Sequence, residues 1–190
     1  MTSERPAYRA LLGALVGTTA YAVIRYNVLK GVPWAALPVY VLNKSLSWSA
    51  VVLFVVAAWR AAATRTAVWN QDHFRQAFAL STTHMLLTLT ILDGTNYPVL
   101  FSGTNLTWAG GVSTLAGVLA MMAFVVWNRG GSGRAAGLLA IPVLTAVHLV
   151  PLGYANWTKP GTWPGSLPPI TLIAFLLCGA ALWFLRSPPR

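Results

Sequence analysis

Six apolar segments of about twenty residues follow one another along the chain, separated by short polar turns. They cover residues 8–24, 37–59, 74–92, 106–127, 135–154 and 167–185. An apolar helix of about 20 residues is long enough to cross the hydrocarbon core of a bilayer. The pattern therefore predicts an all-α membrane protein, a bundle of six transmembrane helices. Because the segments use nearly the whole chain, residues 1–190 are expected to form a single transmembrane domain.

The composition supports this interpretation. Hydrophobic residues make up 56% of the chain, charged residues only 8%, and the mean hydropathy is +0.63. Soluble domains contain about 25% charged residues, so a soluble enzyme, a disordered chain and a disulfide scaffold are excluded. Cys178 is the single cysteine, which excludes an intramolecular disulfide and a metal site built from cysteines alone.

The net charge of +10 would suggest a nucleic-acid partner in a soluble protein, but in a membrane protein the side on which the cations lie matters more. Cytoplasmic loops collect Lys and Arg. The alternating turns predict nine cations on the side of the termini and four on the other. The nine are Arg5, Arg9, Arg60, Arg65, Arg75, Arg129, Arg134, Arg186 and Arg190; the four are Arg25, Lys30, Lys44 and Lys159. We therefore predict cytoplasmic termini and no nucleic-acid partner.

Tryptophan, which favours the membrane interface, supports the same segments. Eight of the nine tryptophans fall at or just beyond a predicted helix end, and Trp48 lies within a segment. The eight are Trp34, Trp59, Trp69, Trp108, Trp127, Trp157, Trp163 and Trp183.

The first segment has an alternative interpretation as a signal peptide. Arg5 and Arg9 precede an apolar stretch that ends in Ala20-Tyr21-Ala22, which is similar to a cleavage site. Removing this segment would break the alternation of charge, so we favour a retained helix.

Two histidines fall inside apolar segments, where ionisable side chains are costly and indicate function. His84 lies nine residues before Asp93, about 13 Å below the outer end of its helix, and His148 lies six residues before Tyr154, about 9 Å below the outer end of its own. The two imidazoles are thus expected at similar depth in the outer half of the membrane.

A histidine on each of two neighbouring helices is what bis-imidazole ligation of a haem requires, because each neutral ring offers one lone pair to the iron. Small residues near the two histidines, Ala77, Ser81 and Thr145, would leave room for the macrocycle. The alternative is that each histidine only forms a hydrogen bond to a neighbouring helix. The matched depth favours the haem site.

Three further polar residues bear on this site. Lys44 is expected two turns below the outer surface, where its ammonium group either snorkels to water or pairs with a haem propionate, and Arg25 at the outer end of the first helix offers the same charge. Asp93, the only acid predicted outside, is expected to cap its helix or to bond Asn96. His73, in the second loop, is expected to be solvated and receives no role.

Short motifs in segments two to six then carry a resemblance to a known family. They are Asn43-Lys44-Ser45-Leu46, Phe74-Arg75 leading to His84, His148, Gly153-Tyr154-Ala155-Asn156-Trp157 and Trp163-Pro164-Gly165-Ser166-Leu167-Pro168-Pro169. The sequence resembles small bacterial members of the ferric reductase-like transmembrane domain family, which are six-helix haem b cytochromes. The resemblance implies His84 and His148 as axial ligands, a possible oxidoreductase, and a location in the bacterial inner (plasma) membrane.

The chain departs from the larger members of that family in two ways. Members with two haems carry two histidines on each ligand helix, whereas each helix here has one, so one haem b is expected. The flavin and nicotinamide domains are absent, so the electrons are expected to come from a quinol or from a partner protein. The alternative hypothesis is a haem-free structural or assembly subunit of a larger membrane complex.

Overall fold

The computed structural model describes residues 4–64 and 71–186, which form six long α-helices with short π-helical, 3-10 and β segments between them. The elements in chain order are α1 (Glu4–Val23), η1 (Ile24–Leu29), η2 (Trp34–Ala36), η3 (Leu37–Val41), α2 (Leu42–Thr64), α3 (Gln71–Ile91), β1 (Phe101–Ser102), β2 (Asn105–Leu106), α4 (Trp108–Arg129), α5 (Arg134–Trp157), η4 (Pro160–Thr162), η5 (Pro164–Ser166) and α6 (Ile170–Arg186).

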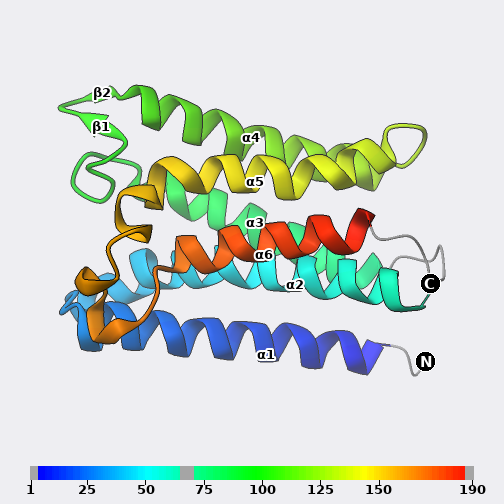
Figure 1. Ribbon diagram of the computed structural model, residues 1–190, viewed down its shortest axis with the longest axis horizontal. Coiled ribbons are helices and arrows are strands. Elements are labelled where there is room, and N and C mark those ends of the chain that lie inside the picture. The colour runs from blue at the N-terminus through cyan, green and yellow to red at the C-terminus, as the bar shows by residue number, and fades with distance from the viewer. Residues whose placement is uncertain (1–3, 65–70, 187–190) are drawn as a thin grey trace.

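The helices lie side by side along the long axis of the molecule (Figure 1). The start of α1 and the end of α6 lie at one end of this bundle, which we call the terminal end. The two-stranded hairpin of β1 and β2, in which Phe101 faces Leu106, lies at the other, which we call the hairpin end. This arrangement matches the up-and-down order of helices that the sequence predicts.

Five of the segments are long and apolar enough to cross a membrane: Ala7–Leu29, Trp34–Ala63, Trp108–Arg129, Arg134–Trp157 and Pro164–Arg186. Each coincides with a predicted segment, so the prediction of helices able to span a membrane is confirmed for five of the six segments. The remaining helix, α3, is 21 residues long but more polar, because its first two turns carry Gln71, Asp72, His73, Arg75 and Gln76.

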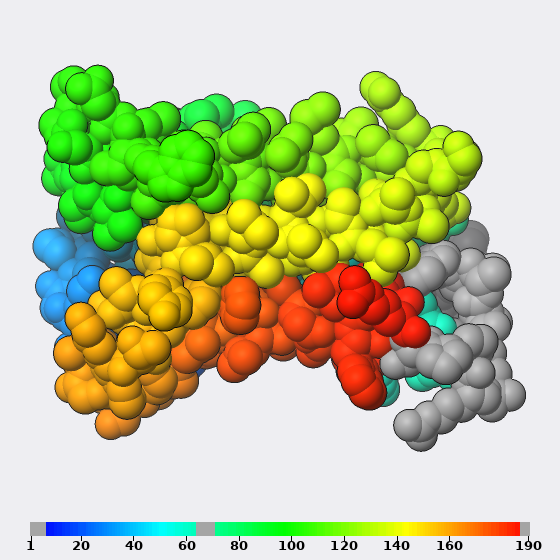
Figure 2. All heavy atoms as spheres, turned by 45° about the horizontal axis from the view of Figure 1, so that its top comes forward, coloured from blue at the N-terminus to red at the C-terminus, as the bar shows by residue number. Residues whose placement is uncertain are grey.

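The packing order places α2 at the centre. This helix packs against α1, α3 and α6, while α5 packs against α4 and α6. Figure 2 shows α4, α5 and α6 in close contact on one face. By contrast, α3 has few contacts with α4. The bundle therefore consists of two groups of helices that α6 joins, with α3 and α5 belonging to different groups.

An aromatic layer of Phe54, Phe74, Phe78, Phe124 and Trp127 joins α2, α3 and α4 near the terminal end. The ring centroid of Phe74 lies 5.1 Å from that of Phe54 and 4.8 Å from that of Trp127. The ring centroids of Phe78 and Phe124 are 5.7 Å apart. Phe74 is completely buried. The few contacts between α3 and α4 thus include two pairs of rings in this layer.

The tryptophans follow the predicted interface only in part. Trp108 and Trp183, at helix ends, are 87% and 73% exposed, as residues facing lipid headgroups would be. Trp127 lies in the last turn of α4, at a helix end as predicted, but its ring is buried in the aromatic layer, where it packs against Phe74. Trp69, together with Arg65 and Arg190, lies outside the described residues.

We predict that Phe74→Ala destabilises the protein by about 3–5 kcal/mol, because truncation of a fully buried aromatic ring leaves a cavity. Leu176→Ala is the matched control, since Leu176 is 62% exposed on α6 and should lose little in a lipid-like medium. Reversible unfolding in mixed micelles measures both. Equal destabilisation by the two variants would contradict the assignment of the aromatic layer to the core.

Candidate functional site

His84 on α3 is held by the neighbouring helix α2. Its Nδ1 lies 2.8 Å from Oδ1 of Asn43 and 3.2 Å from the backbone oxygen of the same residue. Both atoms are acceptors, so the Nδ1–H group of His84 is the donor. The lone pair of the ring is then on Nε2.

Thr88 completes this arrangement one turn further along α3. The side-chain amide nitrogen of Asn43 donates to Oγ1 of Thr88 over 2.9 Å, and the Thr88 hydroxyl donates to the backbone oxygen of His84 over 2.8 Å. The amide orientation that suits Thr88 is the same one that presents Oδ1 to His84. Asn43 is completely buried, so its two bonds fix both its own position and that of the imidazole.

His148 on α5 is held in an equivalent way by α4. Its Nδ1–H donates to the backbone oxygen of Ser113 over 2.9 Å, and the Ser113 hydroxyl donates to the backbone oxygen of His148 over 3.0 Å. Gly117, one turn further along α4, lies against the same ring, and a Cβ there would come within 3.1 Å of Nδ1 of His148. The missing side chain of Gly117 therefore makes room for the imidazole.

The two imidazoles, each anchored to a neighbouring helix in the same way, lie in one region of the bundle. They lie near enough for a charge on one ring to repel a charge on the other. Neither Nε2 atom has a hydrogen-bond partner among the described residues. Neither atom is completely enclosed by the protein. Each Nε2 thus keeps a lone pair that the described residues do not use.

Lys44, the residue after Asn43, lies in a cage of three tyrosine rings. Its ammonium nitrogen is 4.2 Å from the ring centroid of Tyr40, 5.4 Å from that of Tyr97 and 5.5 Å from that of Tyr26. Cation–π contacts of this kind stabilise a charge in an apolar site. Lys44 is also near enough to His84 for their charges to interact, so the cage lies beside the histidine pair.

Arg25 lies in the π-helix η1, close to the same cage. Its guanidinium carbon is 5.9 Å from the ring centroid of Tyr26, and one terminal nitrogen donates to the backbone oxygen of Leu167, just before α6. The side chain is buried and its Nε has no partner. Arg25 therefore ties the hairpin end of α1 to the beginning of α6 and still has hydrogen-bonding capacity.

Several residues of this region were not predicted. Asn43, Ser113 and Gly117 position the histidines, Tyr97 forms one wall of the cage of Lys44, and Lys30 borders that cage. The Lys30 ammonium lies 5.9 Å from the ring centroid of Tyr26, and the Tyr97 hydroxyl interacts with Asn43 and Thr88. The only available signal was the position of Asn43 directly before Lys44.

Two other sequence expectations have clear outcomes. Asp93 accepts hydrogen bonds from the backbone of Thr95 and from Asn96, so the expected contact with Asn96 is confirmed. Hydrogen bonds from Asn96 and Thr95 hold the pKa of the Asp93 carboxyl below its ordinary value. His73 was expected to be solvated, and this prediction is wrong. The side chain is completely buried in the first turn of α3, because this turn packs against α2.

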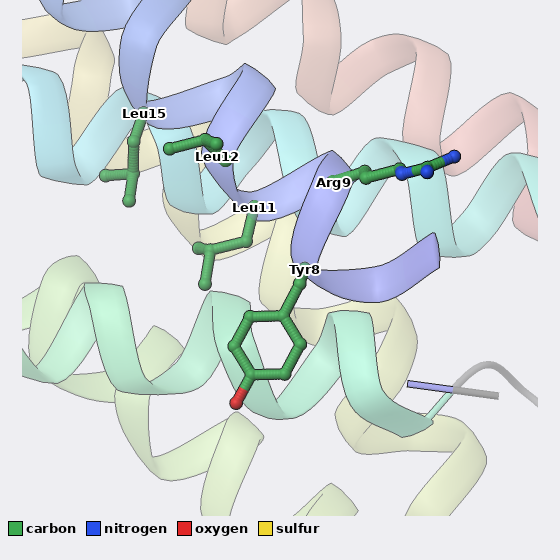
Figure 3. A pocket seen from close by; sticks show the side chains of 5 residues that line it. All are labelled: Tyr8, Arg9, Leu11, Leu12 and Leu15. Carbon is green, nitrogen blue, oxygen red and sulfur yellow. The ribbon is translucent and has the colours of Figure 1, made fainter. Parts of the chain in front are cut away.

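Two further features lie apart from the histidine pair. A cavity of about 290 Å³ near the start of α1 is lined by Tyr8, Arg9, Leu11, Leu12 and Leu15 (Figure 3). Within the described part of the chain, no cluster of three or more His, Cys, Asp or Glu side chains is arranged to hold a metal ion.

Comparison with protein families finds no match for this chain, and neither does comparison with curated proteins or with solved structures. The resemblance to the ferric reductase-like family therefore stays a prediction from the motifs.

We predict that His84 and His148 both carry their neutral proton on Nδ1, because the only acceptors near each ring face that atom. Nitrogen-15 chemical shifts of histidine-labelled protein report the tautomer directly. Asn43→Leu should remove the preference at His84 and leave His148 unchanged. If His84 carried its proton on Nε2 in the wild-type protein, the proposed bond to Asn43 would be refuted.

Proposed function

We propose that the protein is a membrane b-type cytochrome that binds one haem between α3 and α5, with His84 and His148 as axial ligands. The carrying observation is that both rings are anchored through Nδ1 to an oxygen of a neighbouring helix while both Nε2 atoms are free. Histidines that bind metals usually donate their other ring N–H in this way. Haem iron accepts two such imidazoles along one axis.

The residues around the two histidines fit a haem. Gly117 gives the His148 ring room at Nδ1, so the Nε2 atom of that ring needs no protein partner, and α3 and α4 make few contacts with each other. The caged ammonium of Lys44, with Arg25 nearby, supplies positive charge for the two propionates. The aromatic layer fills the terminal half of the bundle, which favours a single haem in the hairpin half.

A bound haem supplies a one-electron iron couple. The residues of this chain then have distinct tasks: Asn43 and Ser113 orient the two imidazoles, Lys44 and Arg25 balance the carboxylates, and the apolar helices exclude water from the iron. The electron donor is a quinol or a partner protein, and the chain acts as an oxidoreductase subunit. We place it in the bacterial inner membrane, in line with the resemblance.

An alternative function follows from the same hydrogen bonds. Because His84 bonds α2 and His148 bonds α4, the two residues could serve only to tie helices together, in a haem-free structural or assembly subunit. In that case the free Nε2 atoms have no task. The visible spectrum of the purified protein separates the two functions.

We predict that His84→Ala and His148→Ala each abolish the low-spin haem spectrum, since a six-coordinate iron needs both imidazoles. The measurement is the reduced-minus-oxidised spectrum after haem-replete expression, normalised to folded protein. His73→Ala is the control and should keep the spectrum per folded molecule. A wild-type low-spin spectrum in either ligand variant would refute the bis-histidine site.

The proposed topology has both termini in the cytoplasm and α3 as the sixth membrane span. We predict that reporter fusions after Ala63 and Arg134 behave as cytoplasmic, because cations concentrate on that side. Fusions after Lys30, Asn96 and Lys159 should behave as external. If the fusions after Ala63 and Asn96 reported the same side, α3 would not be a span.

A further inference from the structure

Three cations meet around one tyrosine ring at the hairpin end of the bundle. Arg25, Lys30 and Lys44 each place their charged group within 6 Å of the ring centroid of Tyr26, at 5.9, 5.9 and 5.5 Å. They come from the π-helix η1, the residue that follows it and the first turn of α2. π-helical turns occur frequently at functional sites.

This cation cluster of Arg25, Lys30 and Lys44 lacks a balancing negative charge among the described residues. All three groups carry a positive charge, and the tyrosine ring that they surround carries none. Asp93 is the one acid predicted at this end, and its carboxylate already accepts three hydrogen bonds within its own turn. A cluster of like charges beside an apolar core is stabilised when an anion binds to it.

The three cations differ in whether their charged groups already form hydrogen bonds within the protein. Arg25 is buried and donates to the backbone oxygen of Leu167, so part of its hydrogen-bonding capacity is used inside the protein. Lys30 and Lys44 have no hydrogen bond from their ammonium groups among the described residues, and both lie over the ring of Tyr26. Two free ammonium groups match two carboxylates.

We propose that Lys30 and Lys44 together bind the two carboxylates of the haem, with Arg25 adding charge and holding the cluster against α6. This inference rests on the proposed haem site and adds Lys30 to the residues that would hold the carboxylates. Lys44 directly follows Asn43, whose side chain accepts the hydrogen bond from His84, so the cluster lies beside the histidine that would hold the haem.

The test compares two probes on the haem-free protein: ferric protoporphyrin IX and its dimethyl ester, which lacks both negative charges. Charge-assisted hydrogen bonds are strong enough to favour the free acid by about tenfold for each carboxylate. Wild-type protein should therefore bind the free acid far more tightly. The preference should fall about tenfold in Lys30→Met and in Lys44→Met and should vanish in the double variant.

The controls keep the outcome clear. Lys159→Met removes one exposed charge from the loop between α5 and α6 and should keep the full preference. Lys30→Arg retains the positive charge that Lys30→Met removes and should show the preference of the wild-type protein. If wild-type protein forms the low-spin complex equally well with both probes, the cation cluster does not bind the carboxylates, although the haem site stands. If neither probe gives a low-spin complex, the proposed function itself is wrong. The wild-type comparison remains decisive even where a variant fails to fold.

Discussion

The hydrogen bond from each intramembrane imidazole to the neighbouring helix is the constraint on which the site depends. A neutral histidine in an apolar bundle has one donor and one acceptor, and a donor without a partner is costly there. His84 meets this requirement on α2 and His148 on α4. Satisfying the donor in this way fixes the tautomer, the ring orientation and the direction in which the remaining lone pair points.

The same constraint explains which residues surround the histidines. Asn43 carries a donor and an acceptor on one planar group, so it can serve His84 and Thr88 at once. Ser113 uses its backbone oxygen for the ring and its hydroxyl for the backbone of His148. Gly117 then supplies only space. Each histidine thus has a small group of residues that position it, drawn from the helix that packs beside its own.

The sequence was sufficient for the helices because a run of twenty apolar residues has few alternatives in a membrane. Helical rise converts residue number into distance, and on that basis the sequence predicts that His84 and His148 lie at similar depth. It could not reveal Asn43, Ser113 or Lys30, because these depend on which helix faces are in contact, and polar residues in apolar segments have no periodic signature. His73 was misassigned for a related reason: a polar turn beside Asp72 and Arg75 reads as a loop, yet packing against α2 buries it.

The aromatic layer bears on the passage of protons along the bundle. Phe54, Phe74, Phe78, Phe124 and Trp127 bring their rings together across three helices between the polar hairpin half and the terminal end. These rings offer no chain of hydrogen-bonding groups along which a proton could pass. The layer therefore offers no relay for protons along the interface that α2, α3 and α4 share.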